Sequence, residues 1–232
     1  MKKGGAALTI IRYLIQGDTI NALIQLIVYA LILIVLIPIH EYSHAKAAYK
    51  LGDDTQKWTG RLTLNPAKHL DFMGSVLLVL FGFGWGKPVK VNNRNFKNHR
   101  TGMALTAAAG PISNIIVAIA ATIVARIFYI FAASSLFCYV LSTLFNMMAS
   151  LSISLAFFNH IPVPPLDGSR IFALVLPDKV ISGIERYSLY FVIGLMALLR
   201  FTPVGDWLHT LIGYVDAGIY LGIDALFRLM GV

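Results

Sequence analysis

The chain has 232 residues, of which 57% are hydrophobic and only 13% are charged, and its mean hydropathy is +0.73. Soluble globular domains carry about 25% charged residues, so this composition excludes an ordinary soluble protein and indicates an integral membrane protein. The formal net charge is +8, but the basic residues cluster beside apolar segments, which is typical of membrane orientation signals and not of nucleic-acid binding. Cys138 is the only cysteine, so any metal must be bound by histidine and carboxylate side chains.

The N-terminal region leads into a long apolar segment. Residues 1–18 include Arg12 and show no evident signal-peptide cleavage site, so we expect an interfacial helix there. Residues 20–39 contain no charged residue, and about 20 apolar residues are enough to cross the hydrocarbon core of a bilayer. We predict one helix over about 19–50, which carries the sequence His-Glu-Tyr-Ser-His at residues 40–44 near its far end.

A polar loop at residues 52–71 precedes an apolar segment with unusual glycine spacing. In this segment glycine alternates with aromatic residues in the order Gly82, Phe83, Gly84, Trp85, Gly86. A period of two disfavours a regular helix. We predict a re-entrant or short β-like membrane segment near residues 72–91, covered by protein or by a water-filled cavity, because lipid cannot satisfy non-helical backbone.

Two further long helices and a C-terminal region complete the predicted fold. Helices are expected over about 102–131 and 136–160, with a turn near 132–135, and a proline-rich sequence ends the second one. One or two spans are expected within 180–230, where the part after Trp207 could instead lie in the membrane interface. The predicted class is an all-α polytopic membrane protein with five to six transmembrane helices. We expect a single domain over 1–232, with a core at 19–172 and C-terminal helices at 180–230.

The charge distribution predicts the orientation. The segment 87–100 contains five basic residues and no acidic one, so we place it in the cytoplasm. The helix over 19–50 then descends towards the cytoplasm, and so does the helix over 136–160. The C-terminal ends of both helices therefore reach the cytoplasmic face of the membrane. We expect a multi-pass protein of the cell membrane with its active site towards the cytoplasmic face.

The chemistry centres on residues 40–44. Positions four apart share a helix face, so His40 and His44 can present ring nitrogens to one metal ion. Glu41 is placed to take a proton from a metal-bound water, and it is one of only two glutamates in the chain. This H-E-x-x-H pattern is typical of zinc metalloproteases. With 6 His and 2 Glu in 232 residues, it arises by chance in on the order of one such chain in a thousand.

A catalytic zinc usually has three protein ligands and one open position, so a third ligand must be found. Asp167 is the best candidate, because it follows three prolines that open the helix and precedes Gly168, which lets the backbone approach closely. His160 is the main alternative. His69 is a weaker one, and we expect it on a surface loop.

Five sequence blocks resemble, in the same order, the conserved blocks of the site-2 protease family of intramembrane zinc metalloproteases. They are HEYSHAKAAYKLGD, GRLTLNPAKHLDFMGS, FGWGKPVKVN, AAGPISN and FNHIPVPPLDGSR, and they cover roughly residues 38–172. The resemblance implies one zinc ion bound by His40, His44 and Asp167, with Glu41 as general base and acid. It also implies cleavage of a transmembrane protein substrate near the cytoplasmic face, usually after another protease has trimmed it.

The same resemblance adds three candidates. Asn114 and Asn159 match asparagines near the family's active site, where an amide can donate to a developing oxyanion or to the substrate backbone. A helix-packing hydrogen bond is an equally good interpretation of both. Pro165 matches the proline of the family's PLDG block. The order of blocks is that of the short bacterial and archaeal branch, so recognition by a PDZ domain is not expected.

The segment Phe83–Val91 suggests how a substrate could be held. A transmembrane helix satisfies its amides internally, so a protease must unwind it, and an extended edge could then pair with the unwound chain by strand addition. Two other functions compete with proteolysis. A metal transporter would need ligands on several helices, and apart from residues 40–44 the spans 102–131 and 136–159 offer none. A catalytically inactive scaffold is disfavoured because every expected ligand and the base are present.

Overall fold

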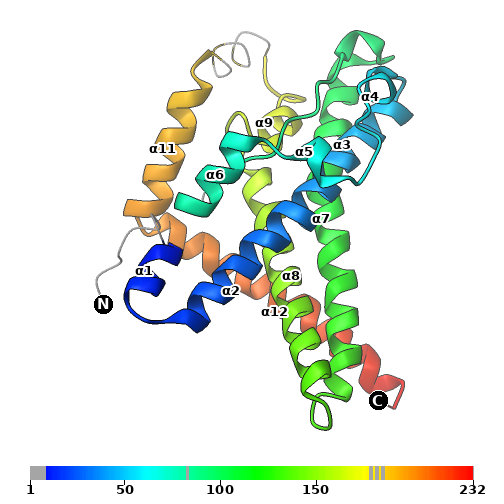
Figure 1. Ribbon diagram of the computed structural model, residues 1–232. Coiled ribbons are helices and arrows are strands. Elements are labelled where there is room, and N and C mark those ends of the chain that lie inside the picture. The colour runs from blue at the N-terminus through cyan, green and yellow to red at the C-terminus, as the bar shows by residue number, and fades with distance from the viewer. Residues whose placement is uncertain (1–8, 82–83, 178–179, 181–182, 184–185, 232) are drawn as a thin grey trace. The chain divides into compact units, whose positions relative to one another are not determined.

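The computed structural model describes the chain except for residues 1–8, 82–83, 178–179, 181–182, 184–185 and 232. Its contacts divide the chain into two compact units, Met1–Lys97 and Asn98–Val232, which we describe in turn. Helices dominate both units (Figure 1), which confirms the all-α class. The expectation of one domain over residues 1–232 stays a prediction.

The first unit is built around one long helix. A short helix α1 (Thr9–Ile15) precedes α2 (Thr19–Ala30), which continues without a break through a π-helical stretch, η1 (Leu31–Leu36), into α3 (Ile37–Lys50). Together they form the single helix predicted over 19–50. The wider π-helical turns lie just before Pro38, whose ring would crowd the preceding turn of a regular α-helix. The helix therefore continues straight into His40.

The remainder of the first unit consists of short elements. Three helices, α4 (Thr55–Trp58), α5 (Pro66–His69) and α6 (Phe72–Phe81), are followed by extended chain from residue 84 and a single 3-10 turn, η2 (Asn93–Asn95). The predicted segment near 72–91 is thus helical in its first half and extended in its second. The alternation of glycine and aromatic residues identified only the extended half, and its residues 82–83 lie outside the described chain. Among the described residues the one β-type contact is an antiparallel bridge between Leu70 and Gly86.

The second unit is organised by two antiparallel helices. Helix α7 (His99–Ile130) and helix α8 (Leu136–His160) lie side by side along much of their length (Figure 1). Small buried residues let the two backbones approach closely, as is common in membrane helices; they are Ala104, Ala107, Gly110, Ala118, Ala121 and Ala125 on α7 and Ala149 and Ala156 on α8. These bounds agree with the predicted helices over 102–131 and 136–160.

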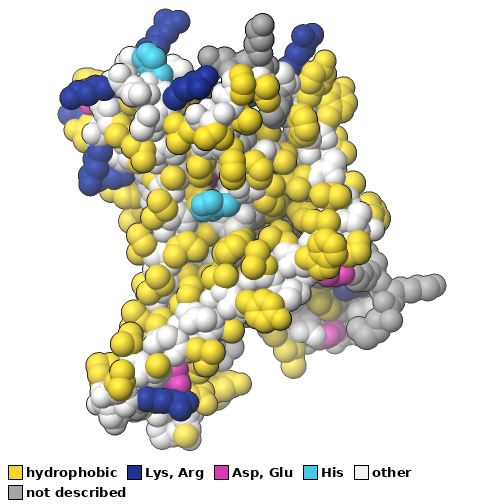
Figure 2. Space-filling model, turned by 180° about the vertical axis from the view of Figure 1, so that it is seen from behind, with side chains coloured by type: hydrophobic (Ala, Val, Ile, Leu, Met, Phe, Trp, Pro, Cys, Tyr) yellow, Lys and Arg dark blue, Asp and Glu magenta, His cyan; other side chains and the backbone are white. Residues whose placement is uncertain are grey.

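Three more helices follow in the second unit. Helix α9 (Asp167–Phe172) contacts α7 and α8, and helix α12 (Val204–Leu229) contacts α7, α8 and α11 (Ser188–Phe201). Within the described chain, four helices are long and apolar enough to cross a membrane, and α12 is one of them. The predicted five to six spans would have to include α11, which is shorter. Hydrophobic side chains cover most of the face drawn in Figure 2, as expected for a membrane protein.

An ion-pair network joins α12 to α7 in this unit. The Asp224 carboxylate lies 2.9 Å from Arg126 Nε and 2.7 Å from Arg228 Nε. The Arg126 and Asp224 side chains are only 13% and 11% exposed, whereas that of Arg228 is 77% exposed. A charge in an apolar environment needs a partner, so Arg126 and Asp224 stabilise each other between the two helices.

Candidate metal centre

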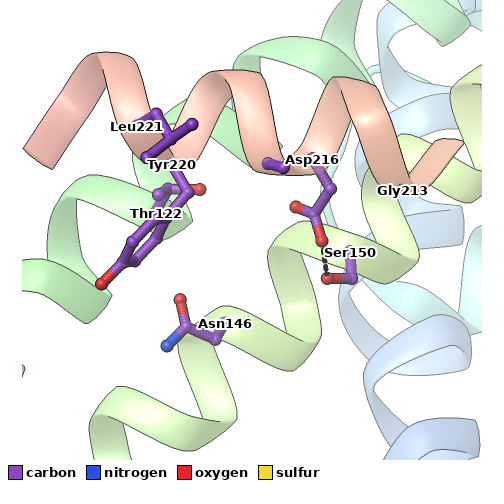
Figure 3. Close-up of a pocket in the computed structure, with 8 residues that line it drawn as sticks. Thr122, Asn146, Ser150, Gly213, Asp216, Tyr220 and Leu221 are labelled. Atoms are coloured by element: carbon purple, nitrogen blue, oxygen red, sulfur yellow. Dashed lines mark hydrogen bonds between the residues drawn. The ribbon is translucent and has the colours of Figure 1, made fainter.

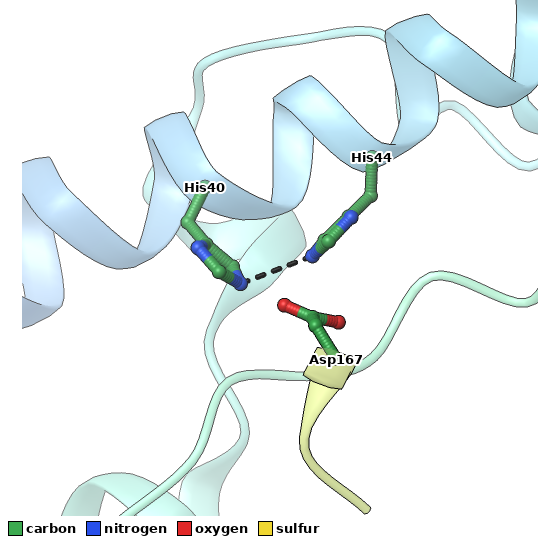
Figure 4. A group of neighbouring side chains, drawn as sticks. All are labelled: His40, His44 and Asp167. Atoms are coloured by element: carbon green, nitrogen blue, oxygen red, sulfur yellow. Dashed lines mark hydrogen bonds between the residues drawn. The ribbon is translucent and has the colours of Figure 1, made fainter. Parts of the chain in front are cut away.

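Helix α3 brings the two predicted histidine ligands together. His40 and His44 project from the same side of the helix, with their Nε2 atoms 3.0 Å apart and their rings 88° from coplanar (Figure 4). Both residues are at least nine-tenths buried. Two nitrogens bound to one tetrahedral zinc at 2.0–2.1 Å would be separated by about 3.3 Å, so the pair fits a shared ion with a small adjustment.

Glu41 lies beside the extended segment at Gly86. A Cβ atom added at Gly86 would be 3.3 Å from Glu41 Oε1 and 2.7 Å from Ile37 Cγ2. An alanine at this position would require the Ile37 side chain to move. The backbone of the segment at Gly86 therefore lies next to the Glu41 carboxylate.

The extended segment is held in place by Asp53, which follows α3 and is fully buried. Its carboxylate accepts hydrogen bonds from Thr55, from Gln56 Nε2, from the Asn92 N–H at 2.9 Å and from Asn95 Nδ2 at 2.8 Å. Burial alone would raise the pKa of this carboxyl group, but the hydrogen bonds outweigh burial and lower the pKa below its ordinary value of 3.8. Asp53 thus fixes the far end of the segment as a charged acceptor.

His69 holds the near end of the segment, and its expected position on a surface loop was wrong. The residue is fully buried, because α5 packs against α3. Its Nε2 lies 2.6 Å from the Thr63 carbonyl oxygen, and its own carbonyl accepts the Lys87 N–H at 2.7 Å. Burial lowers the pKa of His69, which favours the neutral ring. These contacts make His69 a structural residue of the first unit.

Asp167, the predicted third ligand, begins helix α9 of the second unit (Figure 4). Pro164 before it is buried and Pro165 is exposed. A Cβ atom at Gly168 would lie 2.3 Å from the His160 carbonyl oxygen, so the backbone after Asp167 packs directly against the end of α8. The alternative ligand His160 is exposed, and its Nδ1 lies 2.9 Å from the Ala156 carbonyl oxygen. The ligand role of Asp167 stays a prediction.

The two asparagines occupy different environments in the second unit. Asn114 is fully buried on α7, and its backbone carbonyl oxygen accepts a 2.8 Å hydrogen bond from Ser152 Oγ of α8. Asn159 Nδ2 donates to the Leu155 carbonyl oxygen of its own helix at 3.0 Å. Both sets of contacts are those of residues within packed helices, and neither tests the predicted contact with an oxyanion.

A polar cavity that the sequence did not reveal lies between α7, α8 and α12. It has a volume of about 430 Å³, and its polar lining residues are Thr122, Asn146, Ser150, Asp216 and Tyr220 (Figure 3). Ser150 Oγ donates a 2.5 Å hydrogen bond to Asp216 Oδ2 and so connects α8 to α12. In the sequence, the signal that could have indicated this cavity was the carboxylate of Asp216 in the middle of the apolar helix α12.

The apolar helices and the H-E-x-x-H pair on α3 together define a membrane protein of the metallopeptidase class. Sequence comparison gives the family. The family model described as Peptidase family M50 matches residues 124–199. Over 177 residues the chain is 40% identical to YwhC of Bacillus subtilis, covering 75% of this chain and 80% of that protein. The chain belongs to peptidase family M50, and it is a zinc metalloprotease.

Two more relatives are, like YwhC, named "Putative zinc metalloprotease". Rip2 of Mycolicibacterium smegmatis is 26% identical over 162 residues, which cover 66% of this chain and 60% of the relative. CPE1693 of Clostridium perfringens is 38% identical over 71 residues, which cover 27% of this chain and 21% of the relative. No solved structure matches the chain. The resemblance to the site-2 protease family is confirmed.

The contacts of Asp53 predict a local effect of its substitution. Asp53→Asn replaces an acceptor oxygen with an N–H₂ group that opposes the donors of Asn92 and Asn95. The free energy of local opening of the segment after residue 84 should therefore fall by roughly 2–3 kcal/mol. Hydrogen exchange of the Asn92 amide measures this change. In the wild type the same loosening should begin as the pH falls below 3.8, because a carboxyl with a lowered folded pKa loses its stabilising contribution there. The exposed Asp54→Asn is the matched control and should leave the Asn92 amide protected.

Proposed function

We propose that this protein hydrolyses peptide bonds within or near the transmembrane segments of membrane-protein substrates, with one zinc ion bound by His40, His44 and Asp167. The observation that carries the proposal is the buried histidine pair, with Nε2 atoms 3.0 Å apart, in the C-terminal half of a membrane-length helix. Zinc bound there supplies a water of lowered pKa and polarises the scissile carbonyl. The donor set of two imidazoles and one carboxylate is a common one for catalytic zinc.

Glu41 is the proposed general base and general acid. It lies one residue after His40, and no hydrogen bond or ion pair within the described chain occupies its carboxylate. It can therefore accept a proton from the attacking water and deliver it to the leaving amine. Asn114 and Asn159 are proposed as donors to the oxyanion or to the substrate backbone. Pro165 is proposed to shape the turn before Asp167.

The location of the reaction follows from charge and helix length. The basic segment 87–100 directly follows the extended chain of the first unit, and we propose that it lies in the cytoplasm of the cell. The histidine pair lies in the C-terminal half of the 32-residue helix Thr19–Lys50. Cleavage would then occur near the cytoplasmic face of the cell membrane, on a transmembrane protein previously trimmed by another protease.

We further propose that the extended segment binds the unwound substrate by strand addition. Its Lys87 N–H is already paired with the His69 carbonyl, so one edge is satisfied within the protein. Within the described chain no hydrogen bond engages the backbone of Gly86, which faces the other way and lies beside Glu41. A substrate strand paired along this second edge would be guided to the Glu41 carboxylate.

The role of Glu41 is tested by Glu41→Gln in the full-length chain. Loss of the proton carrier should lower kcat by roughly 10²–10⁴-fold while zinc content stays at one ion per chain. Peptide cleavage of a membrane-spanning reporter and metal analysis measure the two effects. A metal transporter would instead show changed metal flux and no proteolysis by the wild type, and an inactive scaffold would show neither. The same variant, expressed in cells, should retain uncleaved substrate for identification.

The third ligand is tested by comparing Asp167→Asn with His160→Ala. If Asp167 is the ligand, its substitution should weaken zinc binding on the order of 100-fold or more, since outer partners of metal ligands alone contribute about 10–100-fold. His160→Ala should keep wild-type affinity, because its ring bonds to its own helix. Competition with a chelator measures both affinities. The reverse order of effects would transfer the ligand role to His160.

The strand-addition proposal is tested at Lys90, where the side chain is exposed. Lys90→Pro removes a backbone donor and should abolish cleavage while zinc content stays unchanged. Lys90→Ala removes the side chain and keeps the N–H, so it should cleave like the wild type. Cleavage of a membrane-spanning reporter distinguishes them, and equal activity of the two variants would contradict strand addition.

A further inference from the structure

Arg61 is a buried cation that binds backbone instead of a carboxylate. It lies in the loop between α4 and α5 and is only 7% exposed. Within the described chain its guanidinium donates from Nη1 to the Lys68 carbonyl and from Nη2 to the Lys87 carbonyl. Burial lowers the pKa of this guanidinium, an effect that the charge of Glu41 partly opposes. A buried charge is costly, so its position indicates a role that a neutral residue would not fill.

The two carbonyls belong to the two chain segments that meet beside Glu41. Lys68 is in α5, directly before His69 and Leu70, which pair with the extended segment, and Lys87 is in that segment. Between them lie the bridge of Leu70 with Gly86 and the 2.7 Å hydrogen bond from Lys87 N–H to the His69 carbonyl. One guanidinium thus holds both sides of a pairing that has few bonds of its own.

The register of this pairing decides which residue faces the Glu41 carboxylate. In the observed register it is Gly86, where even a Cβ atom would lie 3.3 Å from Glu41 Oε1 and 2.7 Å from Ile37 Cγ2. A slip by one residue reverses the direction of every side chain in a strand. It would bring Trp85 or Lys87 to this place, where there is no room for either side chain. A pairing with a single bridge does not by itself prevent such a slip.

We propose that Arg61 is a positioning residue for peptide cleavage: its fork to the Lys68 and Lys87 carbonyls fixes the register that places Gly86 beside Glu41. The inference rests on the proposed role of Glu41 and extends it to the residue that keeps the space at this carboxylate open. Arginine suits the task because its planar guanidinium carries several donors in a fixed fork, whereas lysine has one compact charged group. Charge alone is therefore not sufficient at this position.

The test compares Arg61→Lys with Arg94→Lys, an exposed arginine after the same segment. Cleavage of a membrane-spanning reporter that the wild type cuts gives kcat and KM, and hydrogen exchange reports the Lys87 amide. Arg61→Lys should lower kcat by roughly 10–100-fold, as expected for a small misplacement at a reacting centre. It should also speed exchange of the Lys87 amide. Zinc content and melting temperature should match those of Arg94→Lys.

A second variant tests the space at Glu41 without touching Arg61. Gly86→Ala should lower kcat and leave zinc content unchanged, whereas Gly194→Ala, where an added Cβ meets no atom within 4 Å, should have no effect. Wild-type kcat in Arg61→Lys or in Gly86→Ala would overturn the inference. So would loss of zinc and of thermal stability together with kcat in Arg61→Lys, because that pattern marks a merely structural residue. Glu41→Gln, measured in parallel, separates the two levels: if it remains active, the proposed function itself fails.

Discussion

The candidate metal centre depends on the close approach of an extended backbone to the helix that carries His40, Glu41 and His44. At Gly86 this approach leaves no space for a Cβ atom against Ile37 and little against Glu41. Extended backbone has unpaired donors and acceptors, which apolar surroundings do not satisfy. The segment can lie there only because side chains of the loops before it supply partners. The local sequence around residues 53–69 is therefore as important for the site as the metal-binding motif.

Each of these partners binds a different part of the segment. Arg61 and the His69 carbonyl hold Lys87 at the near end, Gln56 Nε2 holds the Lys90 carbonyl at 2.7 Å, and Asp53 holds Asn92 and Asn95 at the far end. Each uses a charged or amide group that can make several bonds at once. Charge-assisted hydrogen bonds are about twice as strong as neutral ones, so a few residues can fix a segment with only one β-type bridge.

The sequence predicted the parts of this structure that follow from local periodicity. The helix over 19–50 has the predicted bounds, and its uncharged part, residues 20–39, is long enough to cross a bilayer, where a helix satisfies its backbone groups internally. The spacing of His40 and His44 predicted their shared face. The glycine alternation predicted the extended chain after residue 84 but not helix α6, which lies before the alternation begins.

Asp53 and Arg61 were not identified, because their partners lie up to 42 and 26 residues away and such contacts leave no local pattern. His69 was misplaced for the same reason.

Four carboxylates of this chain differ in how far their oxygens are engaged by partners. Asp53 is saturated by neutral donors, Asp224 by two arginines, and Asp216 accepts a hydroxyl from another helix. At Asp53 and Asp224 the partners stabilise the carboxylate and engage both of its oxygens, whereas at Asp216 the serine hydroxyl engages Oδ2 only. Glu41 differs: within the described chain no donor bonds to its oxygens, and a Cβ atom added at Gly86 would lie 3.3 Å from its Oε1. A carboxylate that is enclosed but not saturated keeps its lone pairs for a proton in transit, which is the property that a general base requires.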